Sequence, residues 1–121
     1  GTVDFVTSDH TPLNIELKQV EFDNADYGTI GLESMFGVLN NIFDLEKSID
    51  LLTKGRKTFN IKEPMLKEGD EASLTFFDPT KEYEFSMDDI YSTCKNSLFL
   101  GKSLKGRVLG SLANNSLILN S

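Results

Sequence analysis

The spacing of apolar residues predicts two amphipathic helices near the middle of the chain. Over residues 32–43, apolar side chains recur at the i, i+3, i+4 and i+7 positions that share one helix face. These apolar positions are Leu32, Met35, Phe36, Leu39, Ile42 and Phe43. Asp44 suits the N-cap of a second helix over residues 45–53. Its expected inward positions are Leu45, Ile49 and Leu52. Asn40 and Asn41 are expected to face water.

The region before these helices combines a short β-rich run with a long polar loop. Residues 3–7 are rich in side chains that favour extended backbone, and Pro12 ends the run because it cannot donate a ladder hydrogen bond. Residues 13–29 then carry many charges without a periodic pattern. Loops of this length in compact domains are usually functional or disordered.

After residue 60 the pattern changes to β-strands separated by turns. The expected strands are residues 72–77, 82–85, 105–112 and 116–119. Asp78-Pro79-Thr80 is expected to turn the first two strands into a hairpin, and Asn114-Asn115 is expected to form a tight turn between the last two. By pattern alone, the order of strand, loop, helices and strands is α+β.

Composition narrows the possible function. The 121 residues fall within the size of one domain, and the net charge of −7 argues against binding to nucleic acid or to an anionic membrane surface. No apolar run approaches the length of a transmembrane helix. The single cysteine, Cys94, cannot form an internal disulfide, which suits a reducing cytoplasm. The chain begins with Gly-Thr, as a piece of a longer protein would.

The candidate chemistry lies at the end of the first β-rich run, in Ser8-Asp9-His10-Thr11-Pro12. A strand that delivers an acid and an imidazole at its carboxyl end is typical of catalytic groups in a parallel α/β barrel. Ser and Asp after a strand also form ordinary turns by bonding to their own backbone. The spacing alone favours the turn.

This segment resembles the Thr-Asp-His-Ala-Pro-His signature of the dihydroorotases, in the amidohydrolase superfamily. Residues 22–33, which include Tyr27-Gly28 and end in Gly31-Leu32-Glu33, resemble that family's Phe-Gly and Gly-Leu-Glu loop. Further matches are Leu66, Gly69, Asp70, Ala72, Leu74, Asp78-Pro79, Lys95-Asn96-Ser97, Phe99, Gly101, Leu104, Gly106 and Val108. Because the matches run in order along almost the whole chain, it is identified as the C-terminal part of a dihydroorotase-like protein.

The resemblance implies an α/β fold built from parts of two domains. Residues 1–60 would be the last strand and closing helices of a (β/α)8 TIM barrel, and residues 61–121 would be the C-terminal part of the flanking β-sandwich. The barrel strand and the sheet edges would then have unpaired backbone N–H and C=O groups, which another protein segment is expected to cover. The expected partners are the remaining N-terminal part of the protein and, in a homo-oligomer, a second copy.

The implied activity is zinc-dependent interconversion of carbamoyl aspartate and dihydroorotate in pyrimidine biosynthesis. Asp9 matches the family's catalytic aspartate, which lies at or near the metal, so it is both the catalytic and the metal-ligand candidate. Tyr27 and Gly28 match a pair that borders the substrate. Leu13 stands where the family has a histidine that helps hold the substrate carboxylate, and a leucine can neither donate a hydrogen bond nor carry charge.

The family's His-x-His motif, substrate arginine and bridging lysine have no counterpart in this sequence, so the chain alone is expected to be inactive and to hold no complete zinc site.

Two alternatives to a dihydroorotase stay open. The loss of the histidine at Leu13 also fits a non-catalytic homologue that serves as a structural partner, for example of aspartate transcarbamoylase. A cyclic amidohydrolase of the hydantoinase or allantoinase type is the other alternative.

Overall fold

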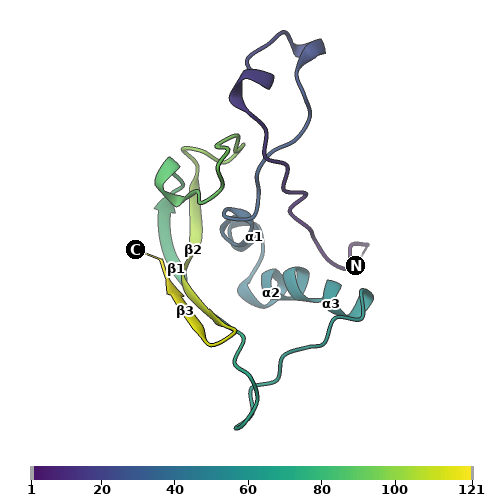
Figure 1. The fold of residues 1–121 in the computed structure, drawn as a ribbon, viewed down its shortest axis with the longest axis vertical. Helices are drawn as coiled ribbons and strands as arrows, with labels where there is room; N and C mark the ends of the chain where they lie inside the picture. The colour runs from purple at the N-terminus through teal and green to yellow at the C-terminus, as the bar shows by residue number, and fades with distance from the viewer. Residues whose placement is uncertain (1, 121) are drawn as a thin grey trace.

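The computed structural model describes residues 2–120, which form three helices, three strands and several short 3-10 turns (Figure 1). The helices are α1 (Met35–Ile42), α2 (Leu45–Thr53) and α3 (Gly55–Thr58). The strands are β1 (Leu74–Glu84), β2 (Ser103–Ala113) and β3 (Ser116–Leu119). The 3-10 turns are η1 (Ile15–Leu17), η2 (Phe22–Asn24) and η3 (Met87–Asp89). The loop with η1 and η2 extends away from the rest of the molecule, at the top of Figure 1.

The strands form one antiparallel sheet in the order β1-β2-β3, and α1 packs against β2. The core lies between the sheet and the start of α1, where Ile30, Phe85, Ile90 and Leu104 are almost fully buried. This is a small mixed arrangement of helices and antiparallel strands. No helix within residues 2–120 has the length and apolar character that crossing a membrane requires.

The second predicted helix is confirmed with the expected bounds, and Asp44 is its N-cap. The Asp44 carboxylate accepts a hydrogen bond from the backbone N–H of Lys47 at 2.8 Å. Its inward face differs from the prediction, because Ser48 and Leu51 are buried while Ile49 is partly exposed. The first helix begins at Met35 rather than at residue 32, after a turn.

Asn40 corrects the prediction that both asparagines at the end of α1 face water. Asn41 is exposed, but Asn40 is buried and its Nδ2 donates to the carbonyl oxygens of Pro79 at 2.9 Å and Lys105 at 3.0 Å. It lies over Gly106, whose φ of 97° and close contacts leave no room for a Cβ. A polar side chain is buried here because it satisfies two sheet carbonyls.

The strand predicted over residues 3–7 is absent from the structure. This segment runs beside α2 and α3, and its backbone contact there is the Val6 N–H donated to the Leu51 carbonyl at 3.0 Å. Phe5 meets Phe59 edge to face at 5.6 Å. A strand needs a neighbouring strand to complete its hydrogen-bond ladder, and no described segment lies there to provide one.

The hairpin predicted over residues 72–85 is also wrong. Both halves belong to the single strand β1 and pair with successive parts of β2. Asp78 pairs with Arg107 and Glu82 with Lys105, so β1 bulges between them. Inside the bulge, the Asp78 carboxylate accepts from the N–H of Thr80 at 2.8 Å. The turn chemistry therefore makes a bulge, which tolerates a proline without a reversal of the chain.

The final predicted hairpin is confirmed. β2 and β3 pair in register from Gly110 with Leu119 to Ala113 with Ser116. Asn114 and Asn115 connect them with φ of 49° and 59°, the two positive values that a tight two-residue turn requires.

Candidate functional site

Asp9 lies in an irregular loop, residues 8–13, which we call the Asp9 turn and whose backbone is held by hydrogen bonds. Its φ is 44°, in the left-handed region that non-glycine residues seldom adopt. The hydroxyl of Thr11 donates to the Asp9 carbonyl at 3.0 Å, and the Thr11 N–H donates to the Thr29 carbonyl at 2.9 Å. His10 and Thr29 form an isolated parallel bridge. Apart from this bridge, residues 8–13 have no regular secondary structure, and the side chain of Asp9 is exposed.

Three of the candidate site residues meet at one cavity of about 360 Å³. Its wall consists of Ser8, Asp9, Lys18, Phe22, Ala25, Asp26, Tyr27, Gly28, Thr29 and Leu98. The structure therefore brings Asp9 to the same cavity as the adjacent pair Tyr27 and Gly28. Gly28 has a φ of 129°, and a Cβ there would lie 2.7 Å from the Thr11 methyl group, so the close approach requires glycine.

Leu13 lies beside this cavity, next to Gly28. Its Cδ1 is 3.4 Å from the position that a Cβ on Gly28 would occupy. Asn96 holds the backbone here, since its Oδ1 accepts from the Leu13 N–H at 3.2 Å and its Nδ2 donates to the Thr11 carbonyl at 3.1 Å. The side chain of Leu13 adds an apolar surface at the place where the family pattern has a histidine.

His10 is held in a chain of hydrogen bonds. Its Nδ1 accepts from the backbone N–H groups of Gly31 and Leu32, each at 3.2 Å. Its Nε2 lies 3.1 Å from the Ser92 hydroxyl, which donates to Glu33 Oε1 at 2.6 Å. The Ser92 N–H donates to the same oxygen at 2.9 Å. Hydrogen bonds to both ring nitrogens therefore hold the imidazole in place.

The carboxylate of Glu33 is the negatively charged end of this series of hydrogen bonds. Burial raises its pKa, but the hydrogen bonds from the Ser92 side chain and backbone outweigh burial, so the pKa of Glu33 lies below its ordinary value. Glu33 Oε2 is buried and has no hydrogen-bond partner within residues 2–120. It lies 3.9 Å from His10 Nδ1.

Sequence reasoning did not single out Glu33 and Ser92 as site residues. The sequence does contain a signal for Glu33, because this residue is the last of the Gly-Leu-Glu match to the family pattern. The sequence contains no such signal for Ser92, because its hydrogen-bond partner His10 lies 82 positions away. Contacts at such separation are fixed by the packing of the sheet against α1 and leave no local pattern.

Residues 2–120 do not by themselves form a zinc site. Across residues 2–120, no three His, Cys, Asp or Glu side chains gather in a way that could hold a metal ion. Both ring nitrogens of His10 already have partners, so among the candidates only Asp9 is free to be a ligand.

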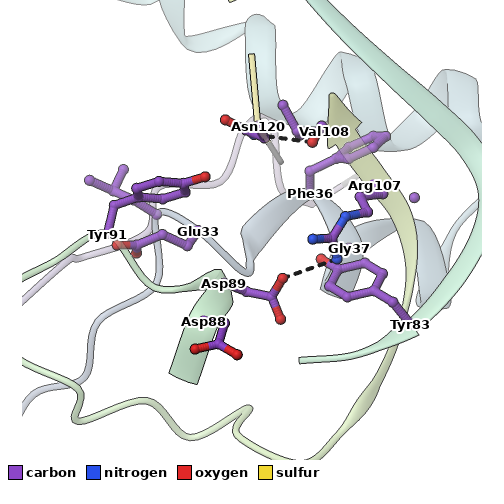
Figure 2. A pocket seen from close by; sticks show the side chains of 12 residues that line it. Glu33, Phe36, Gly37, Tyr83, Asp88, Asp89, Tyr91, Arg107, Val108 and Asn120 are labelled. Atoms are coloured by element: carbon purple, nitrogen blue, oxygen red, sulfur yellow. Dashed lines mark hydrogen bonds and ion pairs between the residues drawn. The ribbon is translucent and has the colours of Figure 1, made fainter. Parts of the chain in front are cut away.

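A second hollow of about 250 Å³ lies on the sheet side of Glu33 (Figure 2). There Arg107 pairs with Asp89 at 3.0 Å and stacks over the Tyr83 ring at 5.0 Å. Burial and the charge of Asp89 raise the pKa of Tyr83. Since Asp89 also caps η3 with Ser86, this group joins β1, η3 and β2.

Comparisons with known proteins give a consistent set of relatives. No family model matches the chain. It is 40% identical over 115 residues to the dihydroorotase of Caldicellulosiruptor saccharolyticus, covering 89% of the chain and 27% of that protein. It is 35% identical to the dihydroorotase of Endomicrobium trichonymphae, covering 98% of the chain and 30% of that protein.

Solved structures show the same partial coverage. The D-hydantoinase (dihydropyrimidinase) from Thermus sp. superposes with a TM-score of 0.81 at 21% identity, over 99% of this chain and 29% of that one. The D-hydantoinase from Bacillus sp. AR9 gives a TM-score of 0.73 at 23% identity, over 97% and 29%. At these identities the likeness shows the fold alone.

The chain thus spans less than a third of the length of the relatives that it matches. The sequence identity runs through nearly all of it, and the fold matches that of part of the hydantoinases. The chain is therefore a dihydroorotase-like homologue in the amidohydrolase superfamily, and it corresponds to a part of such a protein.

Proposed function

We propose that the chain is the C-terminal part of a cytoplasmic, zinc-dependent dihydroorotase. Residues 1–60 would complete a (β/α)8 barrel and residues 61–121 would contribute to a β-sandwich. The observation that carries the proposal is the single cavity shared by Asp9, Tyr27 and Gly28, three site residues of the dihydroorotase pattern. The 40% identity to a dihydroorotase supports it.

The proposed role of Asp9 follows from the chemistry of a cyclic amide. Opening the ring requires that a water molecule lose a proton and that the leaving nitrogen gain one. A carboxylate at the cavity wall can accept the first proton and deliver it to the nitrogen. Tyr27 and Gly28 would line the substrate. Because residues 2–120 do not form a zinc site, the other metal ligands and the substrate arginine would come from the N-terminal part of the protein.

The test is Asp9→Asn in the full-length protein. The amide keeps the shape of the side chain but cannot act as the base, so we expect kcat for dihydroorotate hydrolysis to fall by at least about a hundredfold. The neighbouring exposed acid, Asp4→Asn, is the matched control and should keep its wild-type rate. Normal turnover by the Asp9 variant would reject this role.

The apolar side chain of Leu13 favours a second candidate function. Without the family's histidine, the protein could be a non-catalytic homologue that acts as a structural partner, for example of aspartate transcarbamoylase, or it could take a cyclic amide without that carboxylate. Assays of the full-length protein with dihydroorotate, hydantoin and allantoin separate these possibilities. Turnover of hydantoin or allantoin without turnover of dihydroorotate supports an enzyme of the hydantoinase or allantoinase type, and turnover of none of the three supports the structural partner.

A further inference from the structure

We propose that Ser92 and Glu33 are positioning residues that hold Asp9 in place through His10. The inference rests on the proposed role of Asp9 as the base. It adds two residues from distant parts of the sequence, one before α1 and one after η3. Neither touches the cavity that Asp9 lines, so they act through the backbone of the turn.

The direction of the hydrogen bonds follows from what each atom can do. His10 Nδ1 faces two backbone N–H groups, of Gly31 and Leu32, so it accepts and carries no proton. The proton of the neutral ring is then on Nε2, which donates to the Ser92 hydroxyl at 3.1 Å. A carboxylate only accepts, so the Ser92 hydroxyl proton goes to Glu33 Oε1 at 2.6 Å. The His10 ring nitrogens, the Ser92 hydroxyl and Glu33 Oε1 thus each have one consistent role.

The series of hydrogen bonds from His10 to Glu33 fixes the peptide next to Asp9. The φ of 44° at Asp9 is a costly conformation that persists only where its surroundings hold it. On one side of Asp9, His10 is clamped to Gly31, Leu32 and Ser92. On the other side, the Ser8 carbonyl lies so close to Gly31 that a Cβ there would approach it to 3.0 Å. These contacts on both sides of Asp9 therefore hold the residue whose backbone conformation is costly.

A separate contact from the same segment acts on the same loop. The side chain of Asn96 bonds to the backbone of Thr11 and Leu13, and the backbone carbonyl of Asn96 accepts from the Ile30 N–H at 3.2 Å. The segment after η3 thus contacts the Asp9 turn at two points, through Ser92 and Asn96. This placement explains how residues on the sheet side of the molecule determine the geometry of the turn.

The experiment uses the full-length protein with Ser92→Ala, the conservative Ser92→Thr, and Thr93→Ala as an exposed neighbouring control. Hydrogen exchange is followed at the Thr11 amide, which bonds to Thr29, and at the Ser48 amide in α2 as an internal reference. We expect Ser92→Ala to speed exchange at Thr11 by about tenfold or more, without a change at Ser48. Ser92→Thr restores the wild-type rate because it keeps the hydroxyl.

Steady-state kinetics with dihydroorotate provide the second measurement. Displacement of the base lowers kcat by about ten- to a hundredfold and leaves KM unchanged, and Ser92→Thr restores kcat. Unchanged exchange at Thr11, equal acceleration at Thr11 and Ser48, or faster exchange with an unaltered kcat would each overturn the proposal. If the wild-type protein has no turnover, the proposed function fails, and the exchange measurement still decides whether Ser92 holds the turn.

Discussion

Leu13 is the residue at which this chain departs most from the dihydroorotase pattern. Its backbone is held by Asn96 in the same way as the rest of the turn, so the departure concerns the side chain alone. The side chain lies against Gly28, at the edge of the cavity that Asp9 lines. A basic group introduced here would therefore lie at the border of the proposed substrate site.

We predict that Leu13→His in the full-length protein lowers KM for dihydroorotate. An imidazole can donate to the substrate carboxylate, and such a charge-assisted hydrogen bond contributes about 1.5–3 kcal/mol, which corresponds to about a tenfold decrease or more. Initial-rate measurements over a range of substrate concentrations check this. Leu13→Met, which keeps an apolar side chain, should have the KM of the wild type. An unaltered KM in the histidine variant would mean that the carboxylate is bound elsewhere.

At the residue scale, the sequence was informative where the residues lie near one another in the chain. Asp9, Tyr27 and Gly28 were each singled out because their segments match one family pattern, and all three line one cavity. The link from His10 to Ser92 could not be anticipated. It spans 82 positions and depends on where η3 packs.

At the scale of elements, α1 is attached to the sheet by a polar anchor as well as by apolar packing. Asn40 donates to Pro79 in the β1 bulge and to Lys105 in β2, so one side chain joins the helix to both strands. Phe36 meets Phe77 nearby with ring centroids 4.9 Å apart. Pro79 lies within the bulge, so the bulge provides one of the two carbonyl groups to which the helix is anchored.

We predict that Asn40→Ala lowers the free energy of unfolding by about 2–3 kcal/mol. The substitution removes the donor from two part-buried hydrogen bonds, to the Pro79 and Lys105 carbonyl groups, and each such bond contributes about 1–1.5 kcal/mol. Asn41→Ala is the matched control, since Asn41 is exposed and bonds only to the Ser103 carbonyl; it should cost less than about 1.5 kcal/mol. Urea unfolding at one fixed protein concentration measures both. Equal losses would show that Asn40 is not an anchor.

At the scale of the whole molecule, the exposed surface is large for the mass. The accessible area is 9067 Å² for a chain of 13.5 kDa. A compact monomer of that mass exposes about 6,500 Å². The excess includes strongly exposed aromatic residues, such as Phe22 at 87% and Tyr27 at 91%, and the apolar strand β3. An excess of roughly 2,500 Å² is comparable to an obligate protein interface.

We predict that the 121-residue chain on its own is not a stable monomer. Exposed apolar surface contributes about 25 cal/mol per Å² when it is covered, so association with a second copy or with the N-terminal part of the protein is favoured. Light scattering combined with size-exclusion chromatography should give a mass of at least twice 13.5 kDa. Co-expression with the N-terminal part should replace the self-association. A monodisperse monomer that unfolds cooperatively would refute the prediction.

The sequence by itself determined the features that depend on neighbouring residues. The bounds and cap of α2 and the two-asparagine turn between β2 and β3 rest on side chains acting on backbone within a few positions. The homology was likewise readable, because ordered motifs need no coordinates. The tertiary structure decided the rest. Residues 3–7 have β-forming side chains but no described neighbour to pair with, and β1 continues through Asp78-Pro79 because β2 offers partners on both sides. Strand pairing and burial depend on contacts with residues that are distant in the sequence, and a local sequence pattern does not specify those contacts.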